Sequence, residues 1–61
     1  MRNLDEAYRD LMYLQRRSKR LYCDDLALIL NAKKQDILDA QIGKPVPDEV
    51  HDRLIDWLEM E

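Results

Sequence analysis

The chain has 61 residues and a formal net charge of −3, with hydrophobic residues at 46% and charged residues at 38%. This length allows one small domain near the lower limit for a stable core, so we expect no deep substrate pocket and no enzyme. No apolar run approaches the roughly 20 residues that cross a bilayer. The first residues lack a signal-peptide pattern, and the single Cys23 cannot form an internal disulfide. We therefore expect a cytoplasmic protein.

A first helix is predicted over residues 5–16, with Asn3 or Asp5 as its N-cap. Its expected core stripe consists of Leu4, Ala7 or Tyr8, Leu11 and Leu14, with Met12 on the flank. The basic residues that follow complement the negative end of the helix dipole, and they are Arg16, Arg17, Lys19 and Arg20.

Two short helices separated by a tight turn are predicted next, over residues 24–30 and 33–42. The first carries an apolar stripe of Leu26, Ala27 and Leu30, and the second repeats this spacing at Ile37, Ala40 and Gln41. The sequence Asn31-Ala32 marks the break between them. We therefore expect two helices that pack on a shared core.

The ends of these two helices have recognisable signals. Asp24 or Asp25 is the expected cap of the first, and Asn31 or the turn itself is the expected cap of the second. Gly43 supplies the permissive residue that ends the second helix, and the prolines that follow prevent its continuation.

A fourth helix is predicted over residues 48–59, with Asp48 as its cap. Its apolar stripe contains Val50, Leu54, Trp57 and Leu58, with Ile55 beside it. Trp57 is expected to close this helix over the others. The predicted core of the whole domain consists of Leu11, Leu14, Leu26, Ala27, Leu30, Ile37, Leu54 and Trp57.

The sequence offers little for catalysis or for cofactors. His51 and Cys23 are the only residues of their types, and no metal-ligand spacing accompanies them. The one glycine ends a helix and belongs to no phosphate-binding loop, and no nucleophile has a base beside it. We therefore expect no catalytic residue, no metal, no cofactor and no small-molecule substrate.

Charge is distributed unevenly along the chain. Residues 1–22 hold six basic and three acidic side chains, whereas residues 23–61 hold four basic and ten acidic ones. If the acidic last helix lies away from the turn at Asn31, the molecule has one basic face. The basic run at residues 16–20 is equally consistent with a solvated helix end.

The order of residues from Leu26 to Pro47 resembles the helix-turn-helix of the lambda repressor/Cro-like (Xre-type) family. The positions that match the family pattern without a gap are Leu26, Ala27, Leu30, Ile37, Gly43, Lys44 and Pro47. The positions that depart from it are Asn31, Ala32, Lys33, Leu38 and Gln41. The resemblance covers roughly residues 8–58. It implies an all-α, four-helix helix-turn-helix domain of the lambda repressor-like type over residues 1–61, with its motif core at 24–47.

The resemblance also implies a function, that of a small sequence-specific transcriptional regulator whose partner is double-stranded DNA. Its helix 33–42 would enter the major groove. The residues that would face bases are Lys33, Lys34 and Gln35 in the first turn, then Leu38 and Asp39. The residues that would contact phosphates are Lys44, Arg16, Arg17 and Lys19. A stand-alone domain of this kind would suit a phage or mobile element.

A second interpretation is a protein-interaction module, an inhibitor or adaptor, that has the same fold and does not bind DNA. Asp36 and Asp39 place negative charge on the helix that would face phosphates. The predicted exposed apolar strip consists of Leu28, Ile29, Leu38 and Ile42, and its partner would be a second copy or another protein. Against this interpretation, Leu38 can meet a thymine methyl group and Asp39 can accept a hydrogen bond from cytosine.

Overall fold

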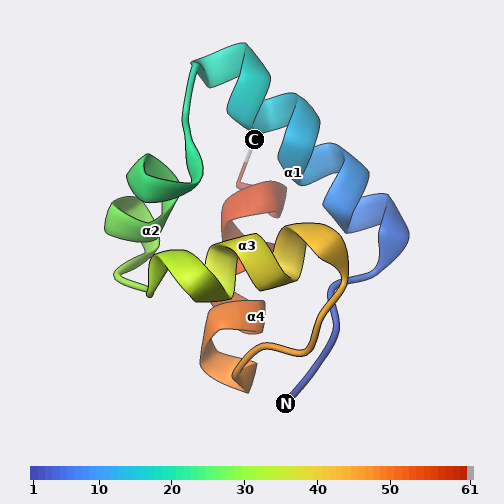
Figure 1. The fold of residues 1–61 in the computed structure, drawn as a ribbon. Helices are drawn as coiled ribbons and strands as arrows, with labels where there is room; N and C mark the ends of the chain where they lie inside the picture. Colours follow the sequence, from blue (N-terminus) through green and yellow to red (C-terminus); the bar gives the residue numbers. More distant parts are fainter. Residues whose placement is uncertain (61) are drawn as a thin grey trace.

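The computed structural model describes residues 1–60, and within them it contains four helices and no extended strand (Figure 1). The helices are α1 Glu6–Lys19, α2 Cys23–Leu30, α3 Lys34–Ile42 and α4 Asp48–Glu59. In Figure 1, α3 lies across the front of the bundle and α4 lies behind it. The all-α prediction with four helices is confirmed, and the main difference in bounds is that α1 continues to Lys19.

Three residues in the left-handed region end the first three helices. Arg20 follows α1 with a φ of 56°, Asn31 follows α2 with a φ of 53°, and Gly43 follows α3 with a φ of 86°. Asparagine and glycine adopt this conformation at little cost, which explains why α2 and α3 end where the sequence indicated. At each end, the N–H of the left-handed residue donates to carbonyls of the last turn.

Several predicted N-caps are wrong. The residue that precedes α2 is Tyr22, whereas Asp24 and Asp25 lie within the helix. The Asp25 carboxylate accepts a hydrogen bond of 3.0 Å from the Tyr22 N–H. Pro47 precedes α4, so that Asp48 is the first helical residue, and Lys33 precedes α3. Asp24, Asp25 and Asp48 all lie in first turns, where negative charge interacts favourably with the helix dipole. Asp5 precedes α1 as predicted.

The core is formed by apolar side chains from all four helices and from the two segments that flank them. Its buried members are Leu4, Met12, Leu26, Ala27, Leu30, Ile37, Ala40, Val46, Val50, Leu54 and Leu58. Five predicted core residues are confirmed, namely Leu26, Ala27, Leu30, Ile37 and Leu54. Trp57 is only half-buried and packs against the edge of this cluster.

The prediction for α1 was wrong about which side of the helix faces the core. Leu11 and Leu14 are 37% and 61% exposed, whereas Met12 is fully buried and Tyr8 packs against the core beside it. The inward side of α1 is therefore formed by Tyr8 and Met12, four residues apart, and Leu4 is buried just before the helix begins. Helical periodicity is compatible with this stripe as well as with the predicted one through Leu11, and the polar contacts of α1 with α3 distinguish them.

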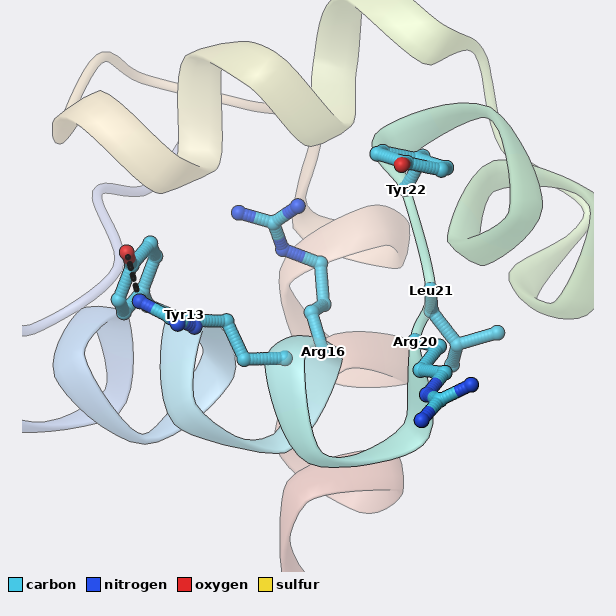
Figure 2. Close-up of a pocket in the computed structure, with 6 residues that line it drawn as sticks. Tyr13, Arg16, Arg20, Leu21 and Tyr22 are labelled. Atoms are coloured by element: carbon cyan, nitrogen blue, oxygen red, sulfur yellow. Dashed lines mark hydrogen bonds between the residues drawn. The ribbon is translucent and has the colours of Figure 1, made fainter.

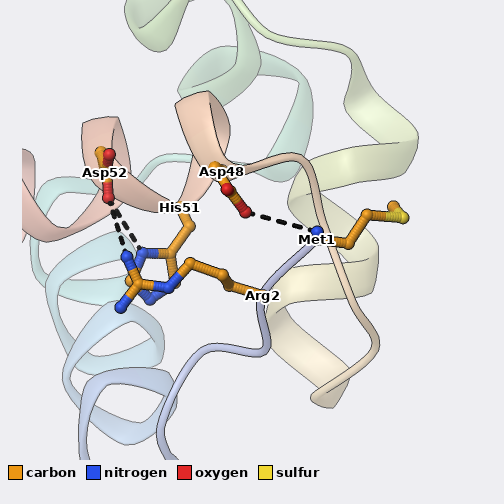
Figure 3. Close-up of polar contacts among 5 residues, drawn as sticks. All are labelled: Met1, Arg2, Asp48, His51 and Asp52. Atoms are coloured by element: carbon orange, nitrogen blue, oxygen red, sulfur yellow. Dashed lines mark hydrogen bonds and ion pairs between the residues drawn. The ribbon is translucent and has the colours of Figure 1, made fainter.

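The N-terminal segment is fastened to the chain that links α3 and α4. The N–H and C=O groups of Arg2 and Val46 form two hydrogen bonds of 2.9 Å, and the Asn3 amide donates to the Gly43 carbonyl at 2.6 Å. Figure 3 shows that the Met1 ammonium group pairs with Asp48 at 3.4 Å. The Arg2 guanidinium group and the His51 ring both approach the Asp52 carboxylate, at 3.4 and 3.3 Å. These contacts hold Leu4 and Val46 in the core.

Candidate nucleic-acid interface

The first turn of α3 is open to solvent. Lys33, Lys34 and Gln35 are all exposed, because the buried side of the helix is formed by Ile37 and Ala40. The Lys34 ammonium group lies 3.3 Å from an Asp24 carboxylate oxygen on α2. The Gln35 amide donates to the Asp39 carboxylate at 2.9 Å, which fixes its side chain along the helix. Three of the predicted base-facing residues therefore lie side by side on one exposed turn.

Arg16 connects α1 to α3. Its guanidinium group donates to the Gln41 side-chain oxygen at 2.9 Å, and the Gln41 amide donates in turn to the Arg9 carbonyl at 3.1 Å. Gln41, a departure from the family pattern, thus serves as donor and acceptor between the two helices. Because these side chains are half-buried, the contacts set how α1 is rotated and turn Met12 inward.

A basic hollow of about 310 Å³ lies at the corner where α1 leads into α2. The residues that line it are Tyr13, Arg16, Arg17, Arg20, Leu21 and Tyr22. In Figure 2, Arg16 extends from α1 toward α3, and Tyr13 and Tyr22 lie on either side of it. Arg17 donates to the Tyr13 hydroxyl at 3.1 Å, and its guanidinium carbon is 5.7 Å from the centre of that ring. The basic hollow presents cationic donors and two aromatic rings to solvent.

Only two of these six residues, Arg16 and Arg17, were predicted to contact DNA. Arg20 was expected on the basic face of the molecule but not among the DNA contacts, and no role was predicted for Tyr13 or Tyr22. The left-handed Arg20 turns the chain back on itself, so that residues on either side of it share one surface. The available signal was a basic run at a helix end with Tyr22 two residues after its last arginine.

The remaining predicted phosphate contacts lie elsewhere. The Lys19 ammonium group lies 5.1 Å from the centre of the Trp57 ring on α4, outside the basic hollow. Lys44 follows the end of α3, where its N–H donates to the Asp39 carbonyl at 2.8 Å and its side chain is exposed. Lys44 and Lys34 therefore mark the two ends of α3.

The apolar strip predicted for the second interpretation is exposed. Leu28 is 82% exposed and Ile29 is 54% exposed on α2, while Ile42 is 62% exposed on α3. Leu38, between them, is partly open to solvent. Ile29 also borders a shallow hollow of about 400 Å³ with Trp57 and Met60. The apolar strip therefore lies on two helices, and its α3 part shares a surface with Gln35.

Comparison of the chain with family models, with curated proteins and with solved structures gives no match. Across residues 1–60, no three or more His, Cys, Asp or Glu side chains come together in a way that could hold a metal ion. None of the four described helices combines the length and apolar character needed to cross a bilayer.

Proposed function

We propose that this protein is a helix-turn-helix DNA-binding regulator that places α3 in the major groove. The observation that carries the proposal is the exposed first turn of α3, whose polar side chains Lys33, Lys34 and Gln35 lie together. An α-helix fits the major groove, and in helix-turn-helix proteins the N-terminal residues of the second helix contact base edges. The buried spacing of Leu26, Ala27, Leu30, Ile37 and Ala40 supports this type of helix pair.

The distribution of charge supports the same docking. Arg16, Arg17 and Arg20 surround the basic hollow between α1 and α2, and Lys44 lies beyond the end of α3. These cations suit phosphate contacts on both sides of the groove, which position a protein without reading sequence. The acidic side chains of α4 hold the Met1 ammonium group and Arg2, so part of the negative charge is compensated on that helix.

The test of this function is an NMR titration of isotope-labelled protein with mixed-sequence duplex DNA at low and moderate salt. Amide shifts confined to residues 33–44 and to the basic hollow, and weakening as salt rises, are the expected result. Absence of shifts at low salt would contradict DNA binding, because electrostatic attraction to phosphates is strongest there.

Gln35→Ala is expected to relax the preference for one base pair at a cost of about 1 to 3 kcal/mol. The physical reason is that a glutamine amide can form two hydrogen bonds with adenine, whereas alanine forms none. The measurement is a competition assay in which each base pair of a selected binding site is varied. Unchanged preference at every position would remove Gln35 from the base-reading set.

A protein-interaction module remains the second candidate, because Leu38 and Ile42 are exposed on the face that would enter the groove. Leu38→Ser/Ile42→Ser is expected to abolish binding of a protein partner on this face and to leave the melting temperature unchanged within a few degrees, since neither side chain belongs to the core. Circular dichroism during heating measures the melting temperature. Unfolding of the variant would instead assign both residues a packing role.

A further inference from the structure

A second apolar stripe runs along the outer side of α1, and α4 covers only its edge, at Leu58. Leu11 and Leu14 lie at its centre, with the small residues Ala7 and Ser18 one turn beyond them on either side. The four positions follow spacings of four, three and four residues, which place them on one side of a helix. A shallow groove of about 500 Å³ lies along this stripe. It is lined by Leu11, Leu14, Ser18 and Leu58, together with neighbouring polar side chains.

We propose that this outer stripe of α1 is the interface of a homodimer, in which the α1 helices of two copies pack antiparallel about a two-fold axis. The stripe is self-complementary in that orientation. Reversal of the second helix places Leu11 opposite Leu14 of the other copy, and Ala7 opposite Ser18. Large side chains then meet at the centre and small ones at the two ends, so the helices can approach closely along their length.

The charges beside the outer stripe select this partner and this orientation. Asp10 and Arg17 are exposed, and both lie on the flank of the stripe that is turned away from Gln15. Seven residues separate them, which is about 10 Å along a helix. A two-fold axis across the stripe brings Asp10 of each copy toward Arg17 of the other and forms two ion pairs. A parallel arrangement would instead place these charged flanks of the two copies on opposite sides of the interface, where no Asp10–Arg17 pair can form.

The apolar centre of the interface lies away from Arg16 and from the exposed turn of α3, and Arg17 is the one residue that borders both the outer stripe and the basic hollow. On α1, the outer stripe and Arg16 point in nearly opposite directions, because Leu14 and Arg16 are two residues apart in a helix. Arg16 is directed to Gln41 on α3, whereas Leu14 and Leu11 border Leu58 on α4. Dimer formation therefore does not rest on the proposed function, and either can fail without the other.

The test is sedimentation equilibrium of two charge-reversal variants, Asp10→Arg and Arg17→Asp, each alone and then mixed in equal amounts. Each variant alone replaces both ion pairs with like-charge contacts, and its dimer is expected to dissociate about tenfold more readily than the wild type. In the mixture, one copy offers only arginines and the other only aspartates, so heterodimers are expected to restore association. Circular dichroism confirms that each variant is folded.

Two further variants assign the contact to the outer stripe. Leu14→Ser is expected to abolish dimer formation, and the control Met60→Ser, at an exposed apolar side chain after α4, is expected to leave it unchanged. A wild-type protein that stays monomeric up to about 1 mM would overturn the proposal. If the mixed charge variants associate no better than either one alone, the antiparallel arrangement is wrong. If the two serine variants have equal effects on dimer formation, the outer stripe is not the interface.

Discussion

Met12→Ala is expected to lower the free energy of unfolding by roughly 2 to 5 kcal/mol, which is most of the stability of a domain this small. The Met12 side chain is completely buried at the centre of α1, where it contacts the shared core. Its removal leaves a cavity that rigid neighbours cannot fill. Heat and urea unfolding, followed by circular dichroism at low protein concentration, measure the effect.

Leu14→Ala is the matched control, because it removes a side chain of similar size from the same helix at a position that is 61% exposed. We expect it to change the free energy of unfolding by no more than about 0.5 kcal/mol when the protein is dilute. The opposite ranking, with Leu14→Ala the more harmful change, would show that α1 is rotated toward the arrangement that periodicity alone predicted.

Arg20→Asn/Lys44→Gln is expected to weaken binding to all DNA sequences and to lower the salt dependence of the binding constant by about 2 log units per log unit of salt. Each substitution removes one cation from the face that includes the basic hollow and the end of α3. Asparagine is chosen at position 20 because it tolerates the left-handed backbone there. Fluorescence anisotropy with labelled duplexes across a salt series provides the measurement.

The control is Arg2→Gln/Lys19→Gln, which removes the same net charge from the side of the molecule that faces α4. Arg2 pairs with Asp52, and Lys19 lies against Trp57. We expect a much smaller loss of salt dependence, since neither cation would contact phosphates. Equal losses in the two double variants would show that DNA responds to net charge only, without the docking proposed for α3.

The helix pair at the centre of the chain could be predicted because its signals are local. Asn31 and Gly43 favour left-handed conformations, and the apolar spacings around them are short and unambiguous. The rotation of α1 could not be predicted in this way. Its sequence carries two apolar stripes, one through Met12 and one through Leu14, and each satisfies helical periodicity equally well.

The candidate site was predicted in part for a similar reason. Lys34 and Gln35 belong to a single turn, so their position follows from the bounds of α3. The basic hollow joins residues on both sides of Arg20, and only the backbone turn at that residue brings Tyr13 and Tyr22 to one surface. The ring contact of Lys19 with α4 likewise depends on how two distant helices pack.

The link through Gln41 has a consequence for the cost of binding. Its amide oxygen accepts a hydrogen bond from Arg16, and its amide nitrogen donates one to the Arg9 carbonyl, so the side chain joins α1 to α3. A carboxylate at this position could accept from Arg16 but could not donate to the Arg9 carbonyl. These two contacts tie α1 to α3 and restrain the distance between the basic hollow and the exposed turn of α3. A ligand that touches both surfaces therefore meets a preorganised site and loses little free energy to ordering it.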